Sequence, residues 1–331
     1  MTAAGAAAPP TLAVEGLSTH FFTKAGVVRA VEDVSFTVDK GEVLGLVGES
    51  GSGKTVTGFS VLGLVDHPGR TVAGRILFRG EDLLAKSAAQ WQQIRGSRIA
   101  MIFQDPMMTL NPVLRIDTQM IEAVQAHEKV SREEARQRAR DALAQVGIPA
   151  AEERLKAYPH QFSGGMRQRV AIAIALINKP DLIIADEPTT ALDVTIQAQI
   201  LFEVQELCRK TGTALIWITH DLTVVAGLAD KICVMYAGKI VEAGPIDGVL
   251  DHPAHPYSLG LIGSVPSRNK RGVPLAQIPG TTPSLLNLPP GCAFRDRCAS
   301  AGEACGQEPD ITLPLPDRPV RCHYPHAGTA P

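Results

Sequence analysis

The segment "GESGSGKT", residues 48–55, constrains the fold of this chain more than any other stretch. It follows the apolar run "EVLGLVG", which is typical of a buried strand, and it precedes a helix that we expect from residue 53 to about 64. A glycine-rich turn in this context points backbone N–H groups into one concavity at the helix N-terminus, where phosphate oxygens bind. The pattern therefore predicts a phosphate-binding loop rather than an ordinary glycine-rich turn. The loop comprises Gly48, Glu49, Ser50, Gly51, Ser52, Gly53, Lys54 and Thr55.

Two side chains at the end of this loop add a charge and a metal ligand. Lys54 places its positive charge at the β- and γ-phosphates of a nucleotide, and Thr55 offers its hydroxyl to Mg²⁺. A second motif, "LIIADEP" (182–188), ends an expected strand with two acids. In this motif Asp186 is placed to hold Mg²⁺ through water, and Glu187 is placed to polarise an attacking water. Acids at strand ends are common, so the motif gains its meaning from the phosphate loop.

A third motif, "FSGGMRQR" (162–169), opens another expected helix. Ser163 and the N–H groups of Gly164 and Gly165 form a second anion site by the same helix-end logic. The alternative is a serine cap with a flexible helix entry. Two phosphate-binding helix ends in one chain indicate that one of them serves a nucleotide held by another subunit.

Strand and helix patterns alternate along the chain, which predicts an α/β fold with a mostly parallel sheet. Residues 12–47 alternate apolar and polar positions, as antiparallel strands do. The expected architecture is a phosphate-loop NTPase core with an antiparallel β subdomain, an inserted helical subdomain and a loop-rich C-terminal extension. The expected boundaries are a disordered lead over 1–11, a nucleotide-binding domain over 12–252 with the helical subdomain at about 106–160, and the extension over 253–331.

Composition excludes some functions. The net charge is −2 and no long basic stripe occurs, which argues against broad nucleic-acid binding. The start of the chain has neither a basic region nor a long apolar region, so a signal peptide is not expected. Apolar runs such as "VAIAIALI" are far shorter than the roughly 18 residues that span a bilayer. We expect a soluble chain, so that any membrane role must come through a partner.

Six motifs occur in the order GESGSGKT, "IFQDP", FSGGM, LIIADEP, "ALD" and "ITHD". Over residues 12 to about 250 the chain resembles the nucleotide-binding subunit of an ABC transporter. The resemblance implies that two such subunits close head to tail, with each ATP between the phosphate loop of one and the "SGG" motif of the other. It further implies that Gln104 senses the γ-phosphate and Mg²⁺ and contacts the membrane partner. Asp193 then bridges the dimer, and His220 holds the γ-phosphate and the attacking water.

Other features of that family are less clear in this sequence. The family stacks adenine on an aromatic residue from the first strands, for which Phe21 and Phe22 are candidates, although core packing explains either equally well. The signature departs from the usual LSGGQ, with Phe162 at the first position and Met166 at the last. The serine and both glycines remain, so phosphate binding is expected, while the polar fifth side chain is lost.

The stretches "YPHQFSGGMRQRVAIAIAL", "DPMMTLNP" and "HPAHPYSLGLIGSVP" narrow the resemblance to the ATPase subunits of dipeptide and oligopeptide importers, including nickel-importer relatives. It implies a heterodimer in which this SGGM-type chain pairs with an SGGQ-type ATPase. It also implies two transmembrane permeases, an extracytoplasmic substrate-binding protein and a peripheral location on the cytoplasmic face of the inner membrane. The alternatives are a soluble ABC ATPase without a permease, such as an iron–sulfur assembly type, and the same motor role for nickel or another small solute. The transported substrate is not encoded in this chain.

Four cysteines near the C-terminus have the spacing C-x5-C-x6-C-x16-C and comprise Cys292, Cys298, Cys305 and Cys322. Close C-x2-C pairs of the zinc-ribbon type are absent. Four soft thiolates in a proline-rich segment suit Zn²⁺ or an iron–sulfur cluster, while disulfides and free thiols stay as alternatives. The resemblance to peptide-importer ATPases, some of which carry a cluster there, favours [4Fe–4S] as a structural staple. Cys208 and Cys233 are expected to be buried structural thiols.

Overall fold

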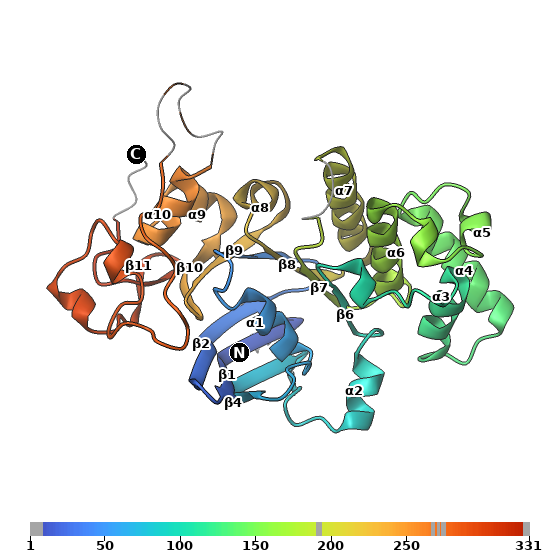
Figure 1. Cartoon of the computed structure of the whole chain (residues 1–331), viewed down its shortest axis with the longest axis horizontal. Coiled ribbons are helices and arrows are strands. Elements are labelled where there is room, and N and C mark those ends of the chain that lie inside the picture. The colour runs from blue at the N-terminus through green and yellow to red at the C-terminus, as the bar shows by residue number, and fades with distance from the viewer. Residues whose placement is uncertain (1–8, 190–193, 266–268, 270–271, 273–275, 327–331) are drawn as a thin grey trace, which may run out of the picture. The chain divides into compact units, whose positions relative to one another are not determined.

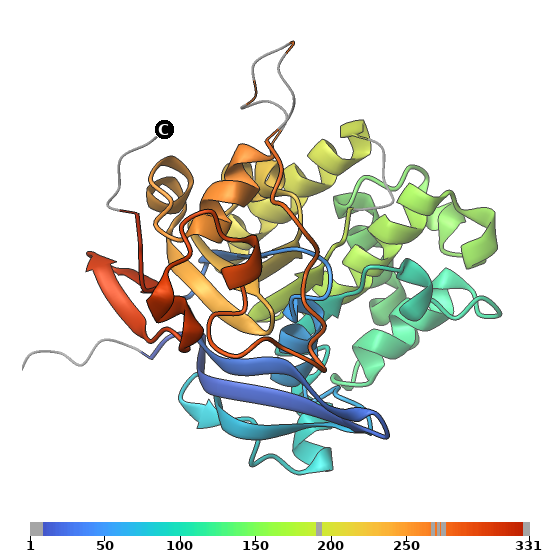
Figure 2. The ribbon, with the colours of Figure 1, turned by 60° about the vertical axis from the view of Figure 1, so that its left-hand side comes forward.

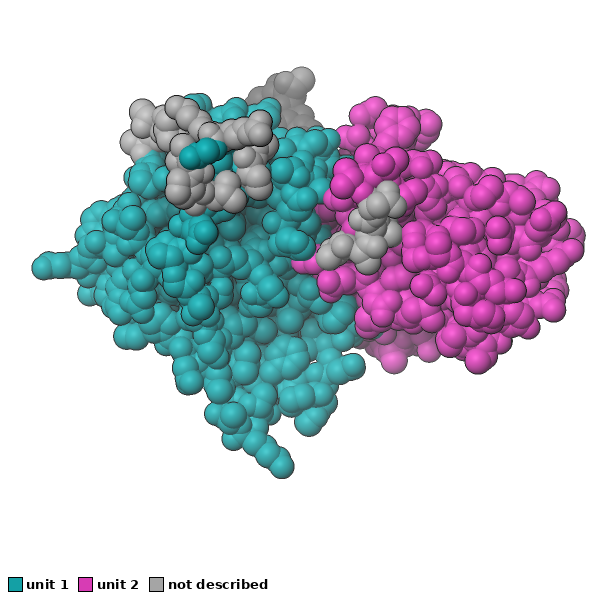
Figure 3. Space-filling view, turned by 45° about the horizontal axis from the view of Figure 1, so that its top comes forward, with its two compact units in different colours: residues 1–39, 43–84, 218–331 teal, residues 40–42, 85–217 magenta. Residues whose placement is uncertain are grey.

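The computed structural model describes residues 9–189, 194–265, 269, 272 and 276–326. The chain divides into two compact units, coloured separately in Figure 3. Unit 1 comprises residues 1–39, 43–84 and 218–331, and unit 2 comprises residues 40–42 and 85–217. The expected disordered lead lies almost entirely outside the described residues, as does Asp193.

Unit 1 contains the predicted antiparallel sheet. Its strands are β1 (Leu12–Thr23), β2 (Gly26–Val38), β4 (Gly69–Phe78) and β5 (Glu81–Asp82), in the order β2-β1-β4-β5. β1 pairs with both β2 and β4 in antiparallel register, with Leu12 opposite Val38 and Phe78. These three side chains are buried, so the apolar positions of the alternating pattern form one face of the sheet.

A second sheet in unit 1 supports the phosphate loop. It contains β3 (Val43–Val47) and β9 (Lys231–Tyr236) in parallel, followed by β10 (Lys239–Pro245) antiparallel to β9. All five residues of β3 are buried, as expected of a strand with apolar side chains on both faces. The helices of unit 1 are α1 (Lys54–Val61), α8 (Leu222–Leu228), α9 (Ile246–Asp251) and α10 (Pro256–Gly263).

The C-terminal extension is rich in loops, and it also adds strands to this sheet. β11 (Ile311–Leu315) pairs with β12 (Arg318–Arg321), and β12 pairs with β10 where Val320 lies opposite Glu242. Figure 2 shows this hairpin in red beside the orange strands of the sheet. Two short 3-10 helices, η4 (Arg295–Arg297) and η5 (Glu303–Gly306), precede the hairpin. The extension is thus joined to unit 1 by backbone pairing as well as by side chains.

Unit 2 contains the parallel strands β6 (Ile99–Ile102) and β7 (Leu182–Asp186), with β8 (Ala214–Thr219) next to β7 (Figure 1). Its helices are α2 (Ala88–Ile94), α3 (Ile116–Gln125), α4 (Arg132–Gln145), α5 (Ala151–Arg154), α6 (Gly164–Leu176) and α7 (Val194–Thr211), with 3-10 turns η1 (Pro106–Met108) and η2 (Pro159–Gln161). Local signals set these helices: Ser131 caps α4 by accepting a hydrogen bond from the Glu134 amide, and Gly147 follows its end with φ 70°. Within the described residues, no helix combines the length and apolarity needed to cross a bilayer.

Candidate nucleotide-binding site

The predicted phosphate loop joins the end of β3 to the start of α1 in unit 1. Gly48 and Gly53 have φ values of 155° and 103°, which favour glycine. A Cβ on Gly48 would lie 2.1 Å from the Met235 carbonyl oxygen, and one on Gly53 would lie 2.2 Å from that of Ala30. Both positions therefore require glycine for two independent reasons. The backbone is held in the concave form that presents N–H groups at the start of α1.

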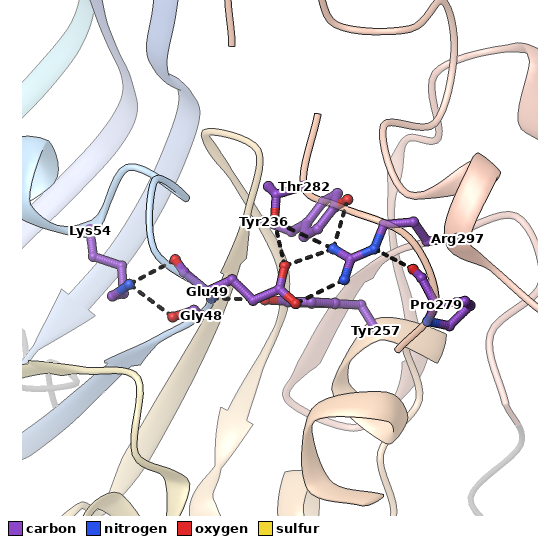
Figure 4. A network of polar contacts seen from close by, with 8 residues as sticks. All are labelled: Gly48, Glu49, Lys54, Tyr236, Tyr257, Pro279, Thr282 and Arg297. Carbon is purple, nitrogen blue, oxygen red and sulfur yellow. Dashed lines mark hydrogen bonds and ion pairs between the residues drawn. The ribbon is translucent and has the colours of Figure 1, made fainter. Parts of the chain in front are cut away.

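Lys54, the first residue of α1, is almost completely buried. Its Nζ donates hydrogen bonds to the carbonyl oxygens of Gly48 and Glu49 at 2.8 and 3.0 Å (Figure 4). The ammonium group therefore lies within the loop, against the backbone of its first two residues. A phosphate bound in this loop gains the charge of Lys54 without drawing the side chain from solvent.

The start of the loop has partners that the motifs did not reveal. The Glu49 amide donates to the Tyr257 hydroxyl at 2.9 Å, and the Glu49 carboxylate accepts from Thr282 at 2.6 Å. Arg297, in the C-terminal extension, binds both carboxylate oxygens of Glu49 (Figure 4). The hydrogen bond from Arg297 is the main cause that lowers the pKa of Glu49, and burial of the carboxylate opposes it. Glu49 is therefore ionised and firmly paired at neutral pH.

Unit 2 contains the acidic motif. Asp186 is the last residue of β7 and is buried, and Glu187 follows it with φ 43°. This left-handed conformation is uncommon for a residue with a side chain. Gln104 lies in the same unit, and its Nε2 donates to the Glu187 carboxylate at 3.3 Å. The structure thus brings Gln104 and Glu187 together.

The "SGG" motif forms the start of α6 in unit 2. The Ser163 hydroxyl accepts a hydrogen bond from the Met166 amide at 3.3 Å, so the serine is the N-cap of this helix. A Cβ on Gly164 would have no atom within 4 Å, so the backbone here is open to an approaching group. A hollow of about 170 Å³ adjoins this point and is lined by Gly164, Gln104 and their neighbours. The cap and an anion site are compatible, because the amides of the first turn still point toward open space.

The remaining predicted nucleotide contacts are distributed over both units. His220 is exposed directly after β8 and belongs to unit 1, beside Asp221, which caps α8. Phe22 is 41% exposed and carries the Arg70 guanidinium 4.5 Å above its ring, whereas Phe21 is half-buried. Exposure therefore distinguishes the two aromatic candidates, which the sequence left equal.

The four C-terminal cysteines occupy one neighbourhood of unit 1. The Cys292 amide donates to the Cys305 carbonyl at 3.0 Å. Burial raises the pKa of Cys322 to about 11, with further contributions from the other three cysteines. All four thiols are free, and among the described residues no three His, Cys, Asp or Glu side chains are arranged to hold a metal ion. Thiols are ligands that soft metals prefer, so the chemistry of the four residues, though not their arrangement in this structure, fits such a metal.

Two family models match this chain. The model described as "ABC transporter" matches residues 31–190, and "Oligopeptide/dipeptide transporter, C-terminal region" matches residues 241–305. The second match covers the part of the extension that supplies Arg297 and three of the four clustered cysteines.

Similar proteins cover nearly the whole chain. The "Dipeptide transport ATP-binding protein DppD" of Bacillus subtilis is 50% identical over 94% of this chain and 93% of its own length. The "Oligopeptide transport ATP-binding protein OppD" of Salmonella typhimurium is 48% identical over 95% of this chain and 93% of its own length.

Solved structures share the fold of the nucleotide-binding part. A dimeric ATP-binding cassette in a post-hydrolysis state, bound to ADP and Pi, is 25% identical with a TM-score of 0.65. It covers 71% of this chain and 98% of its own. The cbiO1 protein of Clostridium perfringens, part of an ABC transporter complex, is 28% identical with a TM-score of 0.62 and covers 72% of this chain and 90% of its own. The prediction of an ABC-type ATPase fold is thereby confirmed.

Proposed function

Because this chain belongs to the family of ATP-binding subunits of dipeptide and oligopeptide ABC transporters, we propose that it is the ATP-hydrolysing motor of a peptide importer on the cytoplasmic face of the membrane. The observation that carries the proposal is the continuous similarity from the phosphate loop through the C-terminal extension. ATPases of other transporters share the first part of this chain, and the second part is what the peptide-transporter model describes.

The chemistry follows from the residues of the two units. The glycine-shaped loop and Lys54 bind the β- and γ-phosphates, and the Thr55 hydroxyl and Asp186 are oxygen donors of the kind that Mg²⁺ prefers. Mg²⁺ neutralises charge on the phosphates when it is bound. Glu187 accepts the proton of the attacking water, and the amide of Gln104 orients that carboxylate. The family resemblance assigns His220 the role of holding the γ-phosphate and the attacking water.

Head-to-tail pairing supplies the remaining contacts. The start of α6, with Ser163, Gly164 and Gly165, serves the nucleotide bound by a second ATPase subunit, and Asp193 bridges the two subunits. Met166 in the signature assigns this chain to the SGGM type and its partner to the SGGQ type. Two permeases couple closure of the pair to the membrane, and an extracytoplasmic binding protein delivers the peptide.

The four-cysteine site is proposed to hold a [4Fe–4S] cluster, with Zn²⁺ as the alternative. The support is the presence of four free thiols in one loop-rich segment, where the other three cysteines contribute to raising the pKa of Cys322. Cys292, Cys298, Cys305 and Cys322 are the ligands in either case, and the metal acts as a structural staple.

The test of the motor function is reconstitution of the chain with an SGGQ-type ATPase and two permeases in lipid vesicles. We expect ATP hydrolysis that rises when a peptide-loaded binding protein is added, and low activity for the isolated chain. Ser163→Arg places bulk and charge in the site that faces the partner's nucleotide, and it should abolish the stimulated rate. The matched control is Ser131→Arg, which makes the same substitution at the serine N-cap of α4, outside this motif.

Two outcomes would contradict this proposal. A purified chain that alone matches the rate of the assembled complex contradicts the shared site. A complex that responds to Ni²⁺ and its binding protein, and to no peptide, contradicts the peptide substrate.

A further inference from the structure

The C-terminal extension contacts the phosphate loop through Tyr257, Thr282 and Arg297, and Arg297 supplies the charged contact. Arg297 Nη1 donates to one carboxylate oxygen of Glu49 at 2.7 Å, and Nη2 donates to the other at 2.9 Å. The Arg297 side chain is 7% exposed and that of Glu49 is 27% exposed. This is a two-pronged guanidinium–carboxylate pair, which is stronger and more directional than a pair of surface charges.

The surroundings hold Arg297 in this orientation. Its Nε donates to the Pro279 carbonyl at 2.8 Å, and its guanidinium lies 5.8 Å from the ring centre of Tyr236. The rings of Tyr236, Tyr257 and Phe294 pack against one another with centroid distances of 4.6 to 5.3 Å. The guanidinium is therefore aimed at Glu49 before any nucleotide arrives.

Glu49 in turn is fixed at every polar group that the structure describes. Its amide donates to Tyr257, its carbonyl accepts from Lys54, and its carboxylate accepts from Thr282 and Arg297. Three of these four partners come from residues 257–297, outside the segment that contains the loop motif (Figure 4). The start of the phosphate loop is thus held mainly by the C-terminal extension, which includes α10.

The negative charge of Glu49 connects these contacts to nucleotide binding. A carboxylate within a loop that binds a polyanionic phosphate chain repels it at short range. A guanidinium on both of its oxygens cancels that charge and prevents the side chain from turning toward the phosphates. Lys54 alone cannot serve both purposes, because its ammonium contacts the loop carbonyls.

We propose that Arg297 is a positioning residue for ATP binding: by pairing with Glu49 it latches the phosphate loop to the C-terminal extension and neutralises the loop's own negative charge. The proposal deepens the proposed motor function and rests on it for the identity of the nucleotide. Under this proposal the C-terminal extension increases the affinity of the chain for ATP.

The test measures nucleotide binding and steady-state hydrolysis separately. ATP affinity is measured on the purified full-length chain with a fluorescent ATP analogue, and KM and kcat are measured in the reconstituted complex. Arg297→Ala is expected to raise Kd and KM for ATP about tenfold and to leave kcat within about twofold, because the latch acts on binding and not on the attacking water. Arg297→Lys keeps one charge and loses the second prong, so an increase of about threefold is expected.

A rescue experiment distinguishes the latch from a general effect on folding. Glu49→Gln in the Arg297→Ala background removes the exposed negative charge and should recover most of the lost affinity. The matched control is Arg295→Ala, two residues earlier in η4, whose side chain pairs with its neighbour Asp296 and not with the loop. This control should leave Kd unchanged.

The outcomes are distinct. An unchanged Kd in Arg297→Ala overturns the proposal, as does a double variant that binds ATP as poorly as the single one. If Arg297→Ala does not fold, the ATP affinity of Arg297→Lys tests the proposal instead. A wild-type Kd for ATP in Arg297→Lys also overturns the bidentate latch. ATP binding to the purified chain is measured without peptide. If peptide does not stimulate hydrolysis in the wild-type complex, the motor function is contradicted, whereas the latch is still tested by the Kd values of the variants.

Discussion

Glu187 combines an unusual backbone with the position expected of a catalytic base. It follows the buried Asp186, has φ 43°, and accepts a hydrogen bond from Gln104. A left-handed conformation of a residue with a side chain costs free energy of order 1–3 kcal/mol. Such conformations cluster where function dictates the direction of a side chain, which supports a functional role for the Glu187 carboxylate.

The first prediction tests this residue as the base. Glu187→Gln keeps the size of the side chain and removes the group that accepts the proton, while the phosphate loop and Asp186 are unchanged. We expect ATP affinity within about twofold of wild type and hydrolysis slower by about 100-fold or more. The control is Glu152→Gln, which removes an exposed carboxylate from α5. Wild-type turnover of Glu187→Gln in the reconstituted complex would remove Glu187 from this role.

At the scale of elements, the start of α10 depends on a neutral imidazole. His255 Nδ1 accepts a hydrogen bond from the Tyr257 amide at 3.0 Å, and the side chain is almost completely buried. Burial lowers the pKa of His255 to about 3. The same helix carries the Tyr257 hydroxyl that contacts the phosphate loop. Protonation of His255 would therefore cost the helix its cap and disturb the support of the loop.

This cap predicts a pH dependence of stability. The folded state holds His255 neutral, whereas the unfolded chain binds a proton near the ordinary histidine pKa of about 6.5. Stability is therefore complete above pH 6.5 and is lost as the pH falls toward 3. Between pH 7 and 5 the loss amounts to about 2 kcal/mol. Thermal unfolding at both pH values measures it.

The matched variants are compared by how much their unfolding temperature changes with pH, and not by their unfolding temperature at one pH. His255→Asn keeps a side chain that caps helices and removes the titrating group, so its unfolding temperature should change less between pH 7 and 5. His160→Asn, at an exposed position, should retain the wild-type slope. Equal slopes for wild type and His255→Asn would contradict a neutral buried imidazole.

The extension permits a prediction about metal. Purified without oxygen, the chain should be brown and contain about four irons and four sulfides if the [4Fe–4S] proposal is correct. Cys298→Ser should bleach it and loosen the extension, while ATP still binds with an affinity no lower than that of Arg297→Ala. Cys208→Ala, in α7 of unit 2, is the control and should keep the colour. A colourless anaerobic preparation with one zinc per chain contradicts the cluster and supports a zinc staple.

At the scale of the whole molecule, the sequence predicted what local patterns encode. The phosphate loop was recognisable because its three glycines and Lys54 lie within seven positions, between an apolar strand pattern and a helix pattern. β11 and β12 were missed, because they are short and β11 is largely exposed at the edge of the sheet. An edge strand of this kind shows little apolar alternation.

The support of the phosphate loop was missed for a different reason. Arg297 stands in a loop-rich segment and carries no motif, and its partner Glu49 occupies a variable position within one. Nothing in the spacing of residues connects them, since the pairing depends on how the extension packs beside Tyr236 and Phe294. The roles of Lys54, Asp186 and Glu187 were predicted from their motifs. The roles of Gln104, Asp193 and His220 were predicted from the family resemblance.

The separation between Glu49 and Arg297 also has a consequence for biosynthesis. The two residues lie 248 positions apart, so the ribosome makes the loop long before it makes the arginine that latches it. At about 5–20 residues per second, the interval is roughly ten to fifty seconds. During that time the nascent chain carries a phosphate loop with an uncompensated carboxylate. Under the proposed latch, ATP binding reaches full strength only when the chain is almost complete, and a product that terminates before residue 297 competes with finished subunits for nucleotide about tenfold less well.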